Sequence, residues 1–230
     1  MKILAIDTSA LTASAALCED DTPIAVYSQK SGLTHSQTML PMIRDLLDNT
    51  KNNIDGIDLM AVSHGPGSFT GVRIGISIIK GLAFGKGKIC IGVSTLEAMA
   101  RNFLTLCSGA LICPVMDARR GQLYTATFEA HGNTLIRLTP DRLFCADQLA
   151  AELESFEKPV FFTGDGYEIM AHLSPACMQT TPQHLRWQNG YGVALAALDA
   201  YRKAPDPSVF TDAALKPQYL RPSQAERELK

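Results

Sequence analysis

Apolar and polar residues alternate along the chain in patterns that predict strands first and a helix next. Strand periodicity covers residues 2–8, 13–17 and 24–28, and polar turns between these segments predict a meander of three strands. In residues 35–49 the apolar positions are three and four apart, which is the spacing of an amphipathic helix. Pro41 lies inside this predicted helix, where it favours a kink.

The following segments predict strands that alternate with helices. We expect a strand at 59–63, then a glycine-rich turn at 64–71 that leads into a helix ending near residue 85. A second strand is expected at 89–93 and a second helix from 95 to about 106. This order is typical of an α/β protein with parallel strands.

The second half of the chain begins like the first. The segment LICPVMDARRGQLYTATFEA repeats the layout of KILAIDTSALTASAALCED, because each has an apolar strand, an Asp, a polar turn and an alternating strand. This duplication predicts two related lobes, with residues 1–108 in the first and 109–230 in the second. Two lobes of this kind resemble the actin-like, sugar kinase and heat-shock ATPase fold, which is also ribonuclease H-like.

Three further elements are expected after the repeat, and all of them fall in the predicted second lobe. They are a helix at about 145–156, a strand at 159–163 and a helix at 190–202. The proline-rich stretch from residue 204 predicts an extended tail.

Composition limits the classes of protein that remain. A net charge of −2 and a pI near 6.2 give no general basic surface, so any role in RNA chemistry is expected to be indirect. The six cysteines form no CxxC pair, which favours free thiols in a reducing cytoplasm. Arg73 and Lys80 interrupt the apolar stretch 72–84, and the start of the chain lacks a long apolar run, so neither a membrane span nor an export signal is expected.

The segment SHGPGSFTGVRIG, from Ser63 to Gly75, is the most specific local pattern. Its glycines allow a strand to turn tightly into a helix, and backbone N–H groups at a helix start can bind an anion. The candidate anion or nucleotide contacts in this turn are Gly65, Gly67, Ser68 and Thr70. A capped turn without a ligand explains the same pattern, and both interpretations stay open.

Two aspartates follow the strands that open the two halves. Asp7, with Ser9 nearby, and Asp117, beside Arg119 and Arg120, are candidate contacts to a cation or a nucleotide phosphate. Asp is also a frequent turn-capping residue, and sequence alone favours that role. The five histidines form no HxxH or HxxxH pair, so no metal site is predicted.

The predicted helix at 72–84 is apolar on more than one side. Such a helix must cover two surfaces, and we expect one of them to bind a second protein together with the preceding helix. A central helix buried within a single chain is the alternative. The candidate partner-binding residues are Met39, Met42, Ile43, Leu46, Val72, Ile76, Ile79 and Lys80.

Six segments together resemble the TsaB (YeaZ) family, and they span nearly the whole chain. They are LAIDTS, HSQTMLPMI, SHGPGSFTGVRIG, MDARRGQLYTATF, FTGDG and PQYLRPSQAE. The resemblance implies a bacterial cytoplasmic protein that binds its catalytic paralogue TsaD and works with the ATPase TsaE. The implied product is N6-threonylcarbamoyladenosine at adenosine 37 of tRNAs that read ANN codons.

The same resemblance implies that this chain is a non-catalytic scaffold. TsaD carries an HxxxH metal motif, and Thr95 and Met99 stand at the two corresponding positions here. The first two helices of each paralogue are expected to form the interface, and the same face is expected to form a homodimer when TsaD is absent. The chain is expected to have no cofactor of its own and no membrane contact. ATP or ADP is expected to bind at the complex interface, and this chain is expected to contact tRNA only as part of the complex.

Two alternative functions are compatible with the sequence. A small-molecule kinase or ATP-binding protein of the same superfamily would use Asp7 and Asp117. A metal-dependent glycopeptidase is the other alternative, and the absence of HxxxH argues against it.

Overall fold

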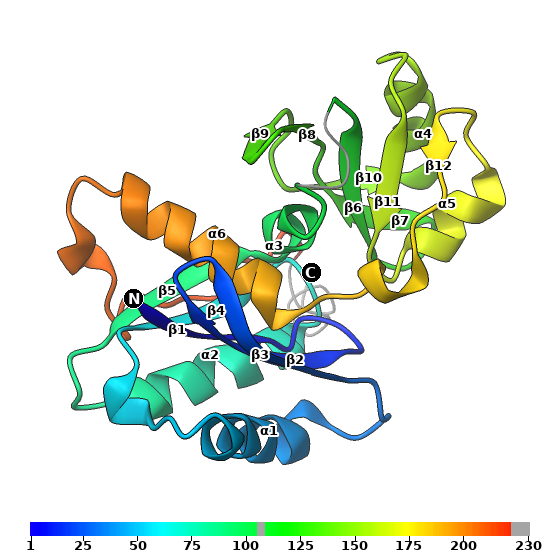
Figure 1. The fold of residues 1–230 in the computed structure, drawn as a ribbon. Helices are drawn as coiled ribbons and strands as arrows, with labels where there is room; N and C mark the ends of the chain where they lie inside the picture. The colour runs from blue at the N-terminus through cyan, green and yellow to red at the C-terminus, as the bar shows by residue number, and fades with distance from the viewer. Residues whose placement is uncertain (105–108, 222–230) are drawn as a thin grey trace. The chain divides into compact units, whose positions relative to one another are not determined.

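The computed structural model describes residues 1–104 and 109–221. The chain divides into two compact units, the first made of Met1–Ala98 and Gln188–Gln218, the second of Met99–Trp187 and Tyr219–Lys230. Each unit has its own sheet with helices packed on it (Figure 1).

The first sheet has five strands in the order β3-β2-β1-β4-β5. The first three strands form an antiparallel meander, while β4 and β5 run parallel to β1. The predicted meander and parallel pairing are therefore confirmed. The strands are β1 (Lys2–Asp7), β2 (Ala13–Glu19), β3 (Thr22–Gln29), β4 (Leu59–Gly65) and β5 (Ile89–Ser94).

Helices cover both faces of this sheet. On one face, α1 (His35–Asn49) and α2 (Phe69–Ala83) pack against the side of β1 that carries Leu4 and Ile6 (Figure 1). Because successive strand residues point to opposite faces, Ile3 and Ala5 lie on the other side. That side is covered by α6 (Gly190–Lys203).

The position of α6 changes the domain division expected from sequence. The expected boundary at 108/109 assigned α6 to the second lobe, but Val193 and Ala197 lie in one buried cluster with Ile3 and Ala5. The helix also begins close to the sheet, since a Cβ on Gly190 would lie 2.7 Å from the backbone nitrogen of Ala16. Without α6, which comes near the C-terminal end of the chain, one apolar face of the first sheet would be exposed.

The second sheet has seven strands, with the central order β10-β7-β6-β11-β12 and β8 and β9 joined through β6. Its helices α4 (Ala146–Glu154) and α5 (Tyr167–Leu173) pack in one buried cluster with β6 and β11. The strands are β6 (Leu111–Asp117), β7 (Gln122–Thr125), β8 (Phe128–His131), β9 (Thr134–Arg137), β10 (Arg142–Cys145), β11 (Val160–Thr163) and β12 (Met178–Gln179).

The internal repeat is confirmed at the level of strand pairing. β6 ends at Asp117 and pairs antiparallel with β7, as β1 ends at Asp7 and pairs antiparallel with β2. The helix expected from 95 to 106 is α3 (Thr95–Arg101), and the part of that prediction at residues 105–108 lies outside the described residues.

The proline-rich tail packs on the first unit, where it contributes Leu215 to the core and forms a 3-10 turn, η3 (Pro207–Val209). The five cysteines in the described residues are free thiols. Within 1–104 and 109–221, no helix combines the length and the apolar character that a membrane crossing needs.

Candidate functional site

The carboxylate of Asp7 joins two turns at one end of the first sheet. It is fully buried, and Oδ1 accepts hydrogen bonds from the Ser9 backbone nitrogen at 2.8 Å and the Ser9 hydroxyl at 2.6 Å. Oδ2 accepts from the Ser63 hydroxyl at 2.5 Å. Burial raises the pKa of Asp7 above its usual value, and these donors, together with the nearby His35, offset part of that effect. Both carboxylate oxygens are thus used within the protein.

The glycine-rich turn packs directly on the β1–β2 turn and on the C-terminal tail. A Cβ on Gly67 would lie 2.5 Å from the carbonyl oxygen of Ser9, and one on Gly71 would lie 2.1 Å from that of Thr8. A Cβ on Gly65 would lie 2.2 Å from the carbonyl oxygen of Gln218. The glycines are therefore needed for close contact between backbone segments of the same unit.

The start of α2 is capped from within the chain. The backbone nitrogen of Ser68 donates to the Ser9 carbonyl at 2.7 Å, and the Ser68 hydroxyl accepts from the Gly71 backbone nitrogen at 3.2 Å. Thr70 is exposed one residue before Gly71. The capped-turn interpretation explains this geometry, and nucleotide or anion contact by Asp7, Ser9 and the turn stays a prediction.

Asp117 lies in the second unit and shapes the β6–β7 turn. Its Oδ1 accepts from the Arg119 backbone nitrogen at 2.7 Å, and its Oδ2 lies 3.3 Å from the Arg119 guanidinium. Asp165 accepts from the Asp117 backbone nitrogen at 3.4 Å, and burial, with a smaller contribution from Asp117, raises the pKa of Asp165. Asp117 has the turn-capping role that its sequence context favours.

The candidate partner-binding residues are, with one exception, part of the unit's own core. The seven apolar members are at most 8% exposed, and Lys80 is half-buried. The prediction that these apolar side chains form a contact surface is wrong, because their stripe of α1 and α2 covers the sheet. They are Met39, Met42, Ile43, Leu46, Val72, Ile76 and Ile79.

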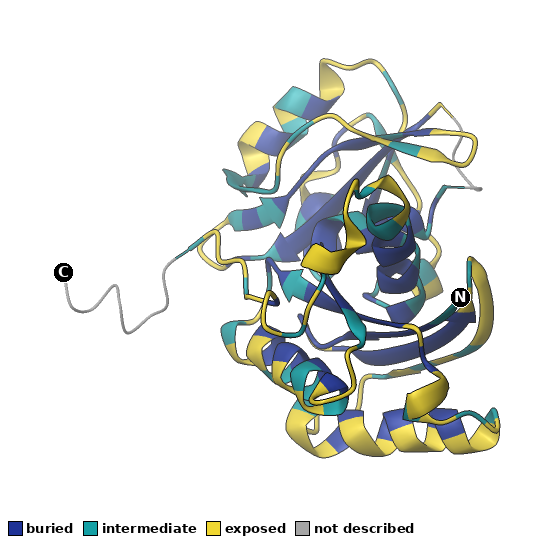
Figure 2. Ribbon diagram, turned by 90° about the vertical axis from the view of Figure 1, so that its left-hand side faces the viewer, coloured by how far each residue is buried: buried dark blue, intermediate teal, exposed yellow. Residues whose placement is uncertain are grey.

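A second apolar stripe on the same two helices does reach the surface. Leu40 on α1 is 48% exposed, and Ile74 and Ile78 on α2 are half-buried, one helical turn apart. In Figure 2, α1 alternates between buried and exposed residues along the lower margin of the molecule. The helix pair thus has the two apolar sides that the sequence predicts, with the residues of the outer side different from those expected.

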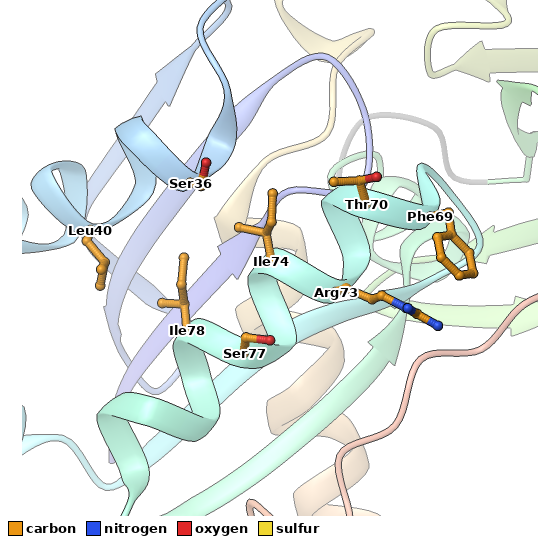
Figure 3. A pocket seen from close by; sticks show the side chains of 8 residues that line it. All are labelled: Ser36, Leu40, Phe69, Thr70, Arg73, Ile74, Ser77 and Ile78. Carbon is orange, nitrogen blue, oxygen red and sulfur yellow. The ribbon is translucent and has the colours of Figure 1, made fainter.

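Between α1 and α2 lies an open groove of about 550 Å³ (Figure 3). It is mainly apolar, and the Arg73 guanidinium lies 3.9 Å from the centre of the Phe69 ring at one end. Hydrophobic periodicity missed this groove because α2 is apolar on both sides, so its spacing alone does not show which side faces the sheet. The groove is lined by Ser36, Leu40, Phe69, Thr70, Arg73, Ile74, Ser77 and Ile78.

Thr95 and Met99, the two residues expected from sequence at the HxxxH positions, lie in the protein interior. Thr95 is fully buried and Met99 is 1% exposed, and neither a threonine hydroxyl nor a thioether is a good substitute for imidazole on a hard or borderline metal ion. Among the described residues, no three His, Cys, Asp or Glu side chains are grouped so that they could hold a metal ion.

The strand, Asp and hairpin that occur in each unit define the fold of the actin-like, sugar kinase and heat-shock ATPase class. Component A of the (R)-2-hydroxyglutaryl-CoA dehydratase from Acidaminococcus fermentans shares the fold, with a TM-score of 0.51 and 12% identity over 90% of this chain and all of that one. YeaZ from Pseudomonas aeruginosa is nearer, with a TM-score of 0.75 and 24% identity over 95% of this chain and 99% of that one.

Sequence comparison narrows the class to a family. Residues 26–228 match the family model described as TsaD, tRNA N6-adenosine threonylcarbamoyltransferase. The tRNA threonylcarbamoyladenosine biosynthesis protein TsaB from Bacillus subtilis is 34% identical, over 98% of this chain and 96% of its own length. The chain belongs to the TsaB (YeaZ) family.

Proposed function

We propose that this chain is a non-catalytic scaffold subunit in the formation of N6-threonylcarbamoyladenosine on tRNA, and that it acts by binding a TsaD-type catalytic subunit. The observation that supports this proposal best is the apolar groove on the outer side of α1 and α2. An exposed apolar surface of this kind is favourable only when a partner removes it from water.

The non-catalytic part of the proposal rests on α3. A subunit that used a metal through an HxxxH motif would need two imidazoles at the positions of Thr95 and Met99, and both positions lie in the protein interior. The internal hydrogen bonds of Asp7 also argue against the kinase alternative, because both carboxylate oxygens are engaged with Ser9 and Ser63.

Family membership supports the remaining features of the proposal. They are modification of adenosine 37 in tRNAs that read ANN codons, cooperation with the ATPase TsaE, and a cytoplasmic location. ATP or ADP is proposed to bind at the complex interface, and the isolated chain is proposed to form a homodimer through the same groove.

Reconstitution tests the scaffold role directly. The chain, TsaD, TsaE, unmodified tRNA, threonine, bicarbonate and ATP are combined, and modified adenosine is measured by mass spectrometry. We expect modification to fall to background when the chain is omitted. Undiminished modification without the chain would contradict the proposal.

Variants of α2 separate partner binding from folding. Ile78→Asp changes the outer groove, and we expect a folded protein that binds TsaD at least 100-fold more weakly, because an unpaired charge in an apolar interface costs several kcal/mol. Ile79→Asp places the same charge in the core, where Ile79 is fully buried, and we expect unfolding instead. Circular dichroism and calorimetric titration with TsaD distinguish the two results.

Val209→Asp is the matched control, since Val209 is an exposed apolar residue of the same unit that lies outside the groove. We expect it to bind TsaD normally. If folded Ile78→Asp protein also binds normally, the groove is not the contact surface.

A further inference from the structure

The β6–β7 turn holds two adjacent arginines in an unfavourable backbone conformation. Arg119 has φ 69° and Arg120 has φ 58°, in the left-handed region that residues with a Cβ adopt at a cost in free energy. Glycine or asparagine is the usual choice at such positions in a hairpin turn. Arginine at both positions therefore lowers the stability of the turn unless the side chains have another use.

The fold does not need these two side chains to shape the turn. Asp117 accepts from the backbone nitrogen of Arg119, and Ala118 donates from its backbone to the Gln122 carbonyl at 2.9 Å. The Arg119 side chain is 86% exposed, and Arg120 is exposed as well. Both side chains are thus accessible to solvent, and the Arg119 guanidinium also lies 3.3 Å from Oδ2 of Asp117.

A third arginine lies beside them. The Arg221 guanidinium donates to the Ala118 carbonyl at 2.9 Å, which brings it against the base of the same turn. We call Arg119, Arg120 and Arg221 the arginine turn.

Within the arginine turn, Arg119 is paired with Asp117, but Arg120 and Arg221 differ from other basic groups of the second unit. Four of those groups form ion pairs with carboxylates of the same unit, whereas no carboxylate within residues 1–104 and 109–221 is paired with Arg120 or Arg221. The four pairs are Arg137 with Asp141, Arg142 with Glu152, Lys158 with Glu129, and Arg186 with Glu168.

We propose that the arginine turn binds the phosphodiester backbone of tRNA while this chain is in its complex. The proposal rests on the proposed function and adds a direct contact to it. Guanidinium groups match phosphate oxygens in charge and in geometry, and phosphate contacts position an RNA without reading its sequence. A local cationic turn also fits a chain whose net charge is −2, since no general basic surface is required.

The test is a salt series of tRNA binding to the complex with TsaD, and to this chain alone, with Arg119→Gln/Arg120→Gln. Each lost phosphate contact should lower the slope of log affinity against log salt by about 1. For the double variant we expect the slope of log affinity against log salt to be lower by about two. Its affinity for tRNA at low salt should be about 10- to 100-fold lower. Arg202→Gln, an exposed arginine on α6, is the matched control and should change neither quantity.

Arg120→Gly separates binding from folding. Glycine relieves the backbone strain, so this variant should melt at a higher temperature than the wild type and yet bind tRNA more weakly. Tighter folding with unchanged tRNA affinity would overturn the proposal.

Three other outcomes would also overturn it, and each leaves the scaffold role to be judged separately. The salt slope and affinity of the double variant could match the wild type. The double variant could lose affinity for TsaD or TsaE instead, which would assign the arginines to an acidic protein surface. It could lose only ADP affinity, which would assign them to a free nucleotide. Failure of the proposed function itself would appear differently, as modification that does not need this chain.

Discussion

The side-chain carboxyl group of Asp7 lies in the protein interior and is not accessible to solvent. Its three hydrogen bonds connect the β1–β2 turn to β4, and they come from Ser9 and Ser63. Since burial is the largest influence and raises the pKa of Asp7, the folded protein holds this proton more tightly than the unfolded chain does.

This difference predicts a pH dependence of stability. The contribution of Asp7 is fully present below the unfolded pKa, near 4, and is lost as the pH rises through the higher pKa of the folded state. Asp7→Asn cannot ionise, so we expect the wild type to lose stability relative to this variant as the pH rises above about 4. Urea unfolding between pH 4 and pH 8 measures the free energy of unfolding of both proteins. Parallel curves of this free energy against pH would show that Asp7 does not titrate in this way.

Two glycines of α2 predict opposite effects of alanine. At Gly71 the new Cβ would lie 2.1 Å from the Thr8 carbonyl oxygen, so Gly71→Ala should lower the free energy of unfolding by about 2–3 kcal/mol. At Gly81 nothing lies within 4 Å, and Gly81→Ala should raise it by about 0.5–1 kcal/mol through helix propensity. Chemical denaturation of both variants tests these two predictions. Equal changes in the free energy of unfolding would mean that the helical turns around Gly71 and Gly81 are not packed as described.

At the scale of the helices, α2 shows what periodicity can and cannot predict. The sequence correctly indicated a helix apolar on two sides, and α1 has the predicted bounds, His35–Asn49. Periodicity could not tell which side faces the sheet, because Ile76 and Ile78 are chemically alike. The inner residue is 5% exposed and the outer one is half-buried, and only the packing against β4 and β1 makes that distinction.

The groove between α1 and α2 also predicts the association state of the isolated chain. Leu40→Glu adds a charge at a 48% exposed position of this surface, so we expect the variant to fold normally and to shift the chain from dimer to monomer. Sedimentation velocity at several concentrations measures the shift. A wild type that is already monomeric at high concentration would contradict the expected homodimer.

At the scale of the whole molecule, the internal repeat was visible in sequence and the unit boundaries were not. Each repeat contains local signals, such as Asp7 and Asp117 at the ends of β1 and β6. The return of residues 188–218 to the first unit depends on the fit of α6 to a distant face of the sheet, and no local pattern encodes that contact.

The return of α6 predicts how fragments behave. A fragment of residues 1–98 would leave Ile3, Ala5 and Ala16 exposed on one face of its sheet, so we expect it to be unfolded or aggregated. Adding a fragment of residues 188–218 should restore the structure, as measured by circular dichroism and protection from protease. A stable fragment 1–98 would show that α6 is dispensable for the first unit.

The position of α6 in the chain also affects the order in which the two units are completed during protein synthesis. The ribosome makes the chain from its amino end, so β1 to β5 emerge first, and the 95 residues between β5 and α6 must be made before α6. The first unit to begin is therefore completed late, after most of the second has been made. During that interval one apolar face of its sheet is uncovered, and we expect chaperones to bind this face.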